Sequence, residues 1–163
     1  MFVIRLTYYS RNQIDHSAGS AIRELGAILE ASSKNNNAAG LTGALVFDER
    51  WFLQTLEGRR TAVWNTFKRI EADERHSNVM VVDARNIRER IFENWWLALV
   101  KPDGSDREIL ATFLRNGHLK PDEMTSEQIL ELMAHLSKIG SSRRLAPSFS
   151  DRFRARESIL SYE

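Results

Sequence analysis

The chain of 163 residues contains no cysteine. This absence excludes disulfide bonds, thiolate metal sites and a cysteine nucleophile. There are only four histidines, and none stands four residues from another, as a zinc-binding helix would require. No G-x-S-x-G segment of a serine hydrolase is present either. The sequence therefore predicts neither a metal site nor these two kinds of nucleophilic catalysis.

The chain also lacks a strong charge and a long apolar run. Its formal net charge is +1, which does not favour nucleic acid or an anionic membrane as a partner. No apolar run approaches the roughly 20 residues of a membrane span, and the first residues, MFVIRLTYY, do not have the pattern of a signal peptide. We therefore expect a cytoplasmic protein that binds neither nucleic acid nor membrane.

Hydrophobic periodicity predicts an α+β protein. The expected strands are 2–9, 41–47, 51–57, 78–83 and 91–100, and the expected helices are 20–34 and 61–73. The segment NNNAAG at 35–40 is expected to end the first helix, because asparagine and glycine both tolerate the left-handed conformation. Residues 48–50 are expected to join two strands in a hairpin. The resulting order, βαββαββ, is ferredoxin-like, with both helices on one face of the sheet.

Two further helices are expected after residue 100. Capping boxes at Ser105–Glu108 and Thr125–Gln128 mark where they begin, and Gly140 is expected to end the second. This helical pair is expected to cover the other face of the sheet, through an apolar stripe on the second helix made of Ile129, Leu132, Met133 and Leu136. Residues 141–163 carry five arginines and three acidic residues, which predicts a basic, loosely ordered tail.

One polar residue stands out in the strand 51–57. Gln54 shares a face with Phe52 and Leu56, and a buried amide without partners costs roughly 1–3 kcal/mol. The first and third strands are neighbours at the centre of a ferredoxin-like sheet, so the phenol of Tyr8 can donate to the amide oxygen while the amide NH₂ group seeks an acceptor. A pair satisfied within the core and a pair that meets a ligand both agree with the periodicity.

Five segments together resemble one family. They are RLTYYS at 5–10, NNNAAGLTG at 35–43, FLQTLEG at 52–58, DERH at 73–76 and FENWWL at 92–97. Their order and spacing resemble those of the BLUF family of blue-light sensors that use flavin, over residues 1 to about 100. The resemblance implies a flavin between the two helices, its N5 and C4 carbonyl facing Gln54. Tyr8 matches the photoactive tyrosine of that family and Gln54 its switching glutamine.

The resemblance also implies the other contacts of the cofactor. Asn36 matches the asparagine that bonds the flavin ring, with Asn35 beside it, and the triplet leaves open which of them meets the ring. Ile28 is implied to pack on the isoalloxazine. The residues implied to lie around the ring edge and the ribityl chain are Arg69, Asp73, Arg75 and His76. FAD is expected, with FMN or riboflavin as alternatives, because the family contacts the adenine weakly.

The last motif departs from the family pattern F-x-x-W-S-M. Trp95 matches, but Leu97 stands where methionine is usual and Trp96 where a small residue is usual. Trp95 and Leu97 share one strand face, so either is a candidate for the space near Gln54 and for transfer of the signal. Trp96 and Tyr9 are expected to pack towards the carboxy-terminal helices.

The resulting hypothesis is a blue-light receptor without enzymatic activity. Its signal would be a rearranged Tyr–Gln–flavin hydrogen-bond network, passed to a partner protein or into a change of homo-oligomer. We expect a photosensor domain at 1–101, a two-helix cap at 102–140 and a flexible tail at 141–163, since nothing after residue 100 is long enough for a cyclase or a phosphodiesterase.

Two alternatives come from other functional classes. A ferredoxin-like hydrolase of the acylphosphatase kind would need a glycine-rich anion loop after the first strand, where YSRNQIDHS stands instead. A regulatory module that is not photoactive would bind a small ligand or a protein between its helices. Bound flavin would make the protein yellow, and the two alternatives require a colourless protein.

Overall fold

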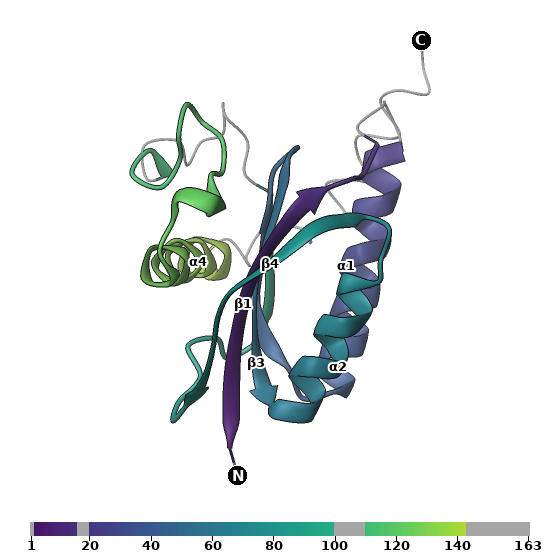
Figure 1. The fold of residues 1–163 in the computed structure, drawn as a ribbon, viewed down its shortest axis with the longest axis vertical. Helices are drawn as coiled ribbons and strands as arrows, with labels where there is room; N and C mark the ends of the chain where they lie inside the picture. Colours follow the sequence, from purple (N-terminus) through teal and green to yellow (C-terminus); the bar gives the residue numbers. More distant parts are fainter. Residues whose placement is uncertain (1, 16–19, 100–109, 143–163) are drawn as a thin grey trace.

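A computed structural model describes residues 2–15, 20–99 and 110–142. One sheet separates two helices on one face from a single helix on the other (Figure 1). The strands are β1 (Val3–Asn12), β2 (Thr42–Phe47), β3 (Trp51–Arg59), β4 (His76–Ile87) and β5 (Trp95–Leu99). The helices are α1 (Ser20–Ala38) and α2 (Arg60–Glu71) on one face and α4 (Ser126–Ser142) on the other, and η1 (Pro121–Glu123) is a short 3₁₀ helix.

The strand order confirms the ferredoxin-like arrangement. The sheet runs β4-β1-β3-β2-β5, and β1 and β3 lie adjacent and antiparallel near its centre. Strand β5 extends the sheet by pairing in parallel with β2. Both crossovers, β1-α1-β2 and β3-α2-β4, skip one strand, and so the two units interleave. Helices α1 and α2 consequently lie over the same face.

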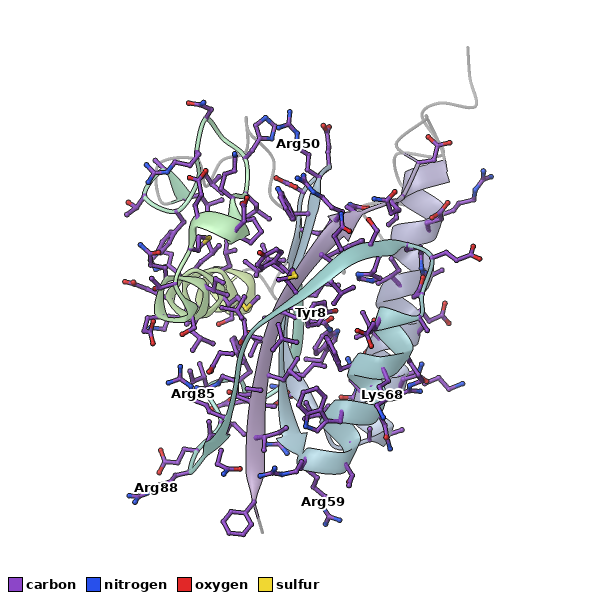
Figure 2. All side chains as sticks on the ribbon, viewed as in Figure 1. Tyr8, Arg50, Arg59, Lys68, Arg85 and Arg88 are labelled. Carbon is purple, nitrogen blue, oxygen red and sulfur yellow. The ribbon has the colours of Figure 1, made fainter. Side chains whose placement is uncertain are left out.

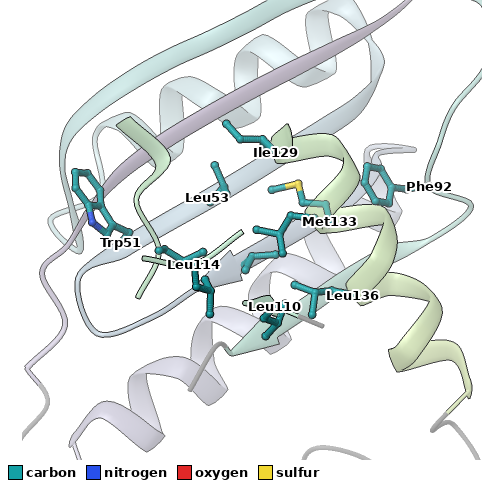
Figure 3. Packing of buried hydrophobic residues seen from close by; sticks show 12 residues of the cluster. Trp51, Leu53, Phe92, Leu110, Leu114, Ile129, Met133 and Leu136 are labelled. Carbon is teal, nitrogen blue, oxygen red and sulfur yellow. The ribbon is translucent and has the colours of Figure 1, made fainter. Parts of the chain in front are cut away.

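Strand alternation divides the core into two parts. Along β3, Leu56 packs with the residues beneath α2, whereas Trp51 and Leu53 pack beneath α4. The α4 stripe predicted from the sequence, with Ile129 and Met133 among its members, is buried in that second cluster (Figure 3). Tyr9 packs against the same cluster, as predicted.

The first helix is longer than predicted, although the predicted segment, NNNAAG, does end it. Helix α1 continues through the asparagine triplet to Ala38. It ends at Gly40, which takes φ 65°, and the N–H groups of Gly40 and Leu41 bond back to the carbonyls of Asn37 and Asn36 at 3.1 and 2.8 Å. This Schellman motif needs a left-handed residue at Gly40, so glycine sets the boundary and the asparagines form the last turn.

Other boundaries differ from the prediction as well. Strand β4 is twelve residues long, because it pairs with almost the whole of β1, and β5 begins only at Trp95. Helix α2 begins at Arg60 without a side-chain cap from the residue before it.

The carboxy-terminal part is described from residue 110 onward. The predicted capping box is present: Gln128 N–H donates to Thr125 Oγ1 at 3.2 Å, and Thr125 N–H donates to Gln128 Oε1 at 2.9 Å. Helix α4 passes Gly140 and extends to Ser142. Most of the helix predicted from Ser105, and residues 143–163 of the predicted tail, lie outside the described residues.

Candidate functional site

Tyr8 and Gln54 stand directly opposite each other on β1 and β3, on the face covered by α1 and α2. Tyr8 is fully buried, Gln54 is 3% exposed, and the Tyr8 hydroxyl donates a hydrogen bond to Gln54 Oε1. Figure 2 shows Tyr8 inside the molecule, whereas Arg59 and Arg85 lie at its periphery. The hydrogen bond predicted for the Gln54 amide oxygen is therefore present.

The environment of Tyr8 keeps its phenol a hydrogen-bond donor. Burial, and to a smaller extent the carboxylate of Asp73, raise the pKa of Tyr8 well above its usual 10. Phe67 of α2 meets the Tyr8 ring edge to face, with the ring centroids 5.2 Å apart. This contact fixes the ring from the helix side while the hydroxyl points to Gln54.

A cavity of about 150 Å³ opens next to Gln54, bounded by α1, α2 and the sheet. Seven of the predicted cofactor contacts line it: Asn35, Asn36, Gln54, Arg69, Asp73, Arg75 and His76. The remaining lining residues are Ala31, Ser32, Leu45, Thr66 and Ile70. Helix α1, the sheet and the carboxyl end of α2 thus bring together residues that are up to 45 positions apart in sequence.

Asn36 differs from its neighbours in the asparagine triplet. Its side chain is buried, with 2% of the residue exposed, whereas Asn35 and Asn37 are exposed. Within the described part of the chain, its amide nitrogen Nδ2 is buried and has no hydrogen-bond partner. A buried donor without an acceptor costs about 1–3 kcal/mol. Asn36 Nδ2, on the cavity lining, is therefore suited to a ligand that brings an acceptor.

Charged groups gather where α2 ends. The guanidinium of Arg75 donates to both carboxylate oxygens of Asp73, with Nε at 2.8 Å from Oδ1. This hydrogen bond lowers the pKa of Asp73 below its usual 3.8, although burial acts in the opposite direction. Arg69 is exposed, and its Nη2 donates to Thr66 Oγ1 at 3.0 Å. The cavity rim thus carries two guanidinium groups and one carboxylate.

His76 is held in a neutral state at the start of β4. Its Nδ1 lies 2.8 Å from Ser10 Oγ, and its ring centroid is 4.4 Å from that of Phe52. Burial lowers the pKa of His76 to about 4, with the nearby Arg75 acting in the same direction and Asp73 against it. At neutral pH the imidazole is uncharged and can exchange hydrogen bonds without adding a charge to the cavity.

Ile28 and Trp95 lie on the cavity face of the sheet without being among the residues that line the cavity. Ile28, a residue of α1, is buried in a cluster with Phe52 and with Leu45, which does line the cavity. Trp95 packs against this cluster, and its Nε1 is buried without a hydrogen-bond partner among the described residues. Leu97 pairs through its backbone with Leu45. The side chains of Leu97 and Trp96 lie outside the described residues.

Several residues of the site were missed from the sequence, although a signal for some was available. Thr66 and Ile70 lie four residues apart, so they project from the same side of α2. Ser10 follows Tyr8 by two residues on the same strand face, which brings it to His76.

Neither a metal-binding cluster nor a membrane-spanning helix is found in the described regions. Residues 2–15, 20–99 and 110–142 hold no cluster of three or more side chains suited to a metal ion. None of the described helices is long and apolar enough to cross a membrane.

Comparison with known proteins gives concordant matches. Photoactivated adenylate cyclase subunit beta of Euglena gracilis is 34% identical over 90 residues, which are 55% of this chain and 10% of that protein. The chain thus spans about a tenth of the length of the curated relatives it matches. Among solved structures, BlsA in its photo-activated state has a TM-score of 0.68 at 22% identity, over 82% of this chain and 94% of BlsA. BlrP1 of Klebsiella pneumoniae with FMN and cyclic diGMP has a TM-score of 0.55 at 28% identity, over 67% of this chain and 30% of BlrP1.

The family model described as sensors of blue light using FAD matches residues 3–98, more than half of the chain. These residues include β1 to β4, all of β5 except its last residue, both helices over the cavity, and the Tyr8–Gln54 pair. The chain belongs to the BLUF family.

Proposed function

We propose that Tyr8 and Gln54 form the photoactive pair of this blue-light receptor, and that the cavity between α1 and α2 holds the flavin. The observation that carries the proposal is the buried hydrogen bond from the Tyr8 hydroxyl to Gln54 Oε1, since Gln54 also lines the cavity. The light signal is then a change in the hydrogen bonds of Gln54.

The lining residues fit an isoalloxazine ring, which has flat apolar faces and a polar edge. Leu45 and Ile70 offer apolar surface, and Asn36 Nδ2 is a buried donor that a ring carbonyl would satisfy. Arg69 and Arg75 at the rim would favour a phosphate on the ribityl chain. Asn36, rather than Asn35, is the asparagine we assign to the ring, because only its amide is both buried and without a partner.

When bound, the flavin supplies blue-light absorption and, once excited, a strong oxidant. Tyr8 can then give up an electron, and its phenolic proton is already directed at Gln54 Oε1. The Gln54 amide has a donor end and an acceptor end, so turning it by half a turn exchanges the two. The pair can therefore rest in two hydrogen-bonded arrangements without any movement of the backbone.

FAD is the flavin that we propose, in line with the description of the family. The BlrP1 structure with FMN makes FMN the main alternative. FMN and FAD both carry phosphate, whereas riboflavin does not, so the rim arginines favour the first two. Denaturing the purified protein and identifying the released chromophore by its retention and mass decides among the three.

The output is proposed to pass to a partner protein or into a change of self-association, in the cytoplasm. Relatives of this chain include photoactivated adenylate cyclase subunits, of which it spans about a tenth. We assign no cyclase activity to this chain, because its match lies in the sensor region, residues 3–98. The division into a sensor at 1–101, a cap at 102–140 and a tail at 141–163 stays a prediction.

Absorption spectroscopy under blue light tests the function. The purified protein should be yellow, and illumination should shift its flavin absorption slightly to the red, reversibly in the dark and without loss of oxidised flavin. A colourless protein that takes up no flavin would instead support a regulatory module that binds another ligand between α1 and α2.

A further inference from the structure

Glu57 is a fully buried carboxylate for which the proposed light reaction has no use. It lies near the end of β3, opposite Arg5 of β1, whose Nε donates to Glu57 Oε1 at 2.7 Å. The same carboxylate accepts the backbone N–H groups of Ile91 at 3.0 Å and Phe92 at 3.1 Å. A buried charge is tolerated only when it is paired and hydrogen-bonded. Here the bonds that satisfy Glu57 tie the β4–β5 connection to the centre of the sheet.

Other contacts hold the same connection on both sides of these two residues. The Arg90 guanidinium donates to the Gly40 carbonyl at 3.0 Å and to Thr42 Oγ1 at 3.1 Å. The Gly43 N–H donates to the Asn94 carbonyl at 3.3 Å. Arg90 is exposed to solvent, whereas Glu57 is not, so the buried carboxylate is the stronger of these anchors.

The anchored segment places side chains on both faces of the sheet. Phe92 is 4% exposed and belongs to the cluster beneath α4 that includes Met133 and Leu136 (Figure 3). Trp95, three residues later, packs against the apolar clusters on the cavity face. A short stretch of backbone thus joins the surroundings of the cavity to α4.

We propose that Glu57 is a positioning residue that carries the light signal across the sheet. Because Glu57 belongs to β3, the strand of Gln54, and holds the N–H groups of residues 91 and 92, any shift of β3 that follows the change at Gln54 is passed to the backbone of Phe92 and to its packing against α4. Without that anchor, Phe92 can keep its position when β3 shifts. The inference rests on the proposed function, because it needs a light-induced change at Gln54. It adds the route by which that change leaves the cavity face.

The test measures the flavin-loaded protein in the dark and under blue light, by absorption and by hydrogen exchange of α4, in the wild type and in Glu57→Gln. The amide keeps the size of the carboxylate, but it turns an NH₂ group towards N–H donors and removes the charge that pairs with Arg5. We expect Glu57→Gln to keep the red shift and to lose the light-induced change in α4 protection.

Thr55→Val is the matched control. Thr55 is fully buried on the same strand, two residues before Glu57, and its hydroxyl lies 2.9 Å from that of Thr7 on β1. The Thr55→Val substitution removes one buried hydrogen bond from the same strand face but leaves the bonds of Glu57 to residues 91 and 92 in place. Helix α4 should therefore respond to light as in the wild type. Phe92→Leu replaces Glu57→Gln in the test if the latter does not fold. Phe92→Leu keeps the Glu57 anchor and the cavity but reduces the packing against α4, so it should also weaken the light response of α4.

Three results would overturn the inference. One is a wild type with a red shift but equal α4 protection in dark and light. Another is a full α4 response in folded Glu57→Gln, or in Phe92→Leu where Glu57→Gln does not fold. A third is loss of the α4 response in the Thr55→Val control, because any buried polar loss would then have the same effect. Absence of the red shift in the flavin-loaded wild type is a separate result, which would overturn the proposed function itself.

Discussion

Gln54 and Glu57 are three residues apart on β3, and their side chains lie on opposite faces of the sheet. Gln54 accepts a hydrogen bond from Tyr8 beside the cavity, and Glu57 holds the backbone before β5 on the face covered by α4. Both residues are buried, at 3% and 0% exposed, so both must find partners within the protein or a ligand. One strand therefore carries the proposed switch and the proposed anchor.

Gln54→Leu should abolish the light response and keep the chromophore. Leucine is close in size to glutamine, so the cavity wall is preserved, but it has neither a donor nor an acceptor end. We expect yellow protein without the red-shifted state, as measured by a light-minus-dark difference spectrum. A normal photocycle in this variant would mean that the amide is only a packing residue.

Asn36→Ala should weaken flavin binding. One hydrogen bond contributes about 0.5–1.5 kcal/mol net, which corresponds to a roughly 2- to 10-fold higher Kd for flavin. Asn37→Ala is the matched control, since Asn37 is exposed on the next position of α1 and does not line the cavity. Titration of flavin-free protein, followed by fluorescence quenching, gives both constants. Equal Kd values for the two variants would remove Asn36 from the flavin site.

His76 should make the free energy of unfolding depend on pH. Its folded-state pKa of about 4 lies below the usual 6.5, so the unfolded chain binds the additional proton between these values. Stability should therefore fall as the pH is lowered from 7 towards 4, by at most about 3 kcal/mol from this group. The lowered pKa of Asp73 acts in a different window, because its contribution is lost only below pH 3.8.

Urea unfolding of wild type and His76→Gln, at matched flavin content and at several pH values from 7 to 4.5, isolates the histidine. The variant should show the shallower pH dependence. Identical slopes in the two proteins would show that His76 protonates equally well in the folded state.

Asp48→Asn should loosen the attachment of the carboxy-terminal segment to the sheet. Asp48 is 2% exposed; its Oδ1 accepts the N–H groups of Arg50 and Trp51, both at 2.8 Å, and its Oδ2 accepts that of Leu119 at 2.9 Å. An asparagine must turn its NH₂ group towards one of these donors, at a cost of about 1–3 kcal/mol. Asp122→Asn, at an exposed position, is the control. Unfolding midpoints in urea that are equal for the two variants would contradict this role.

The parts of the structure that the sequence predicted are those set by local periodicity. Strand alternation placed Tyr8 and Gln54 on one face, and the spacing of apolar residues placed the α4 stripe on the other. The end of α1 could not be predicted from composition, because asparagine is tolerated both in a last helical turn and after it. The left-handed conformation of Gly40 decides between the two.

The buried charges could not be predicted from local pattern at all. Arg5 and Glu57 are 52 positions apart, and Asp48 and Leu119 are 71 apart. Each of these carboxylates is satisfied by backbone groups of a distant loop, and no short-range pattern in the sequence marks such a partner. The cavity residues of α2 could be predicted in part. Their helical spacing is visible in the sequence, but the side of the helix that meets a ligand is not.

The most direct test of the Tyr8–Gln54 switch is the blue-light difference spectrum of Tyr8→Phe, measured beside the wild type with equal flavin content. Phenylalanine keeps the ring that packs on Phe67 and removes only the hydroxyl that donates to Gln54. We expect a yellow variant with no red shift, and a wild type whose red shift forms and decays reversibly. A red shift of normal size in Tyr8→Phe would show that the Tyr8 hydroxyl is not part of the light switch.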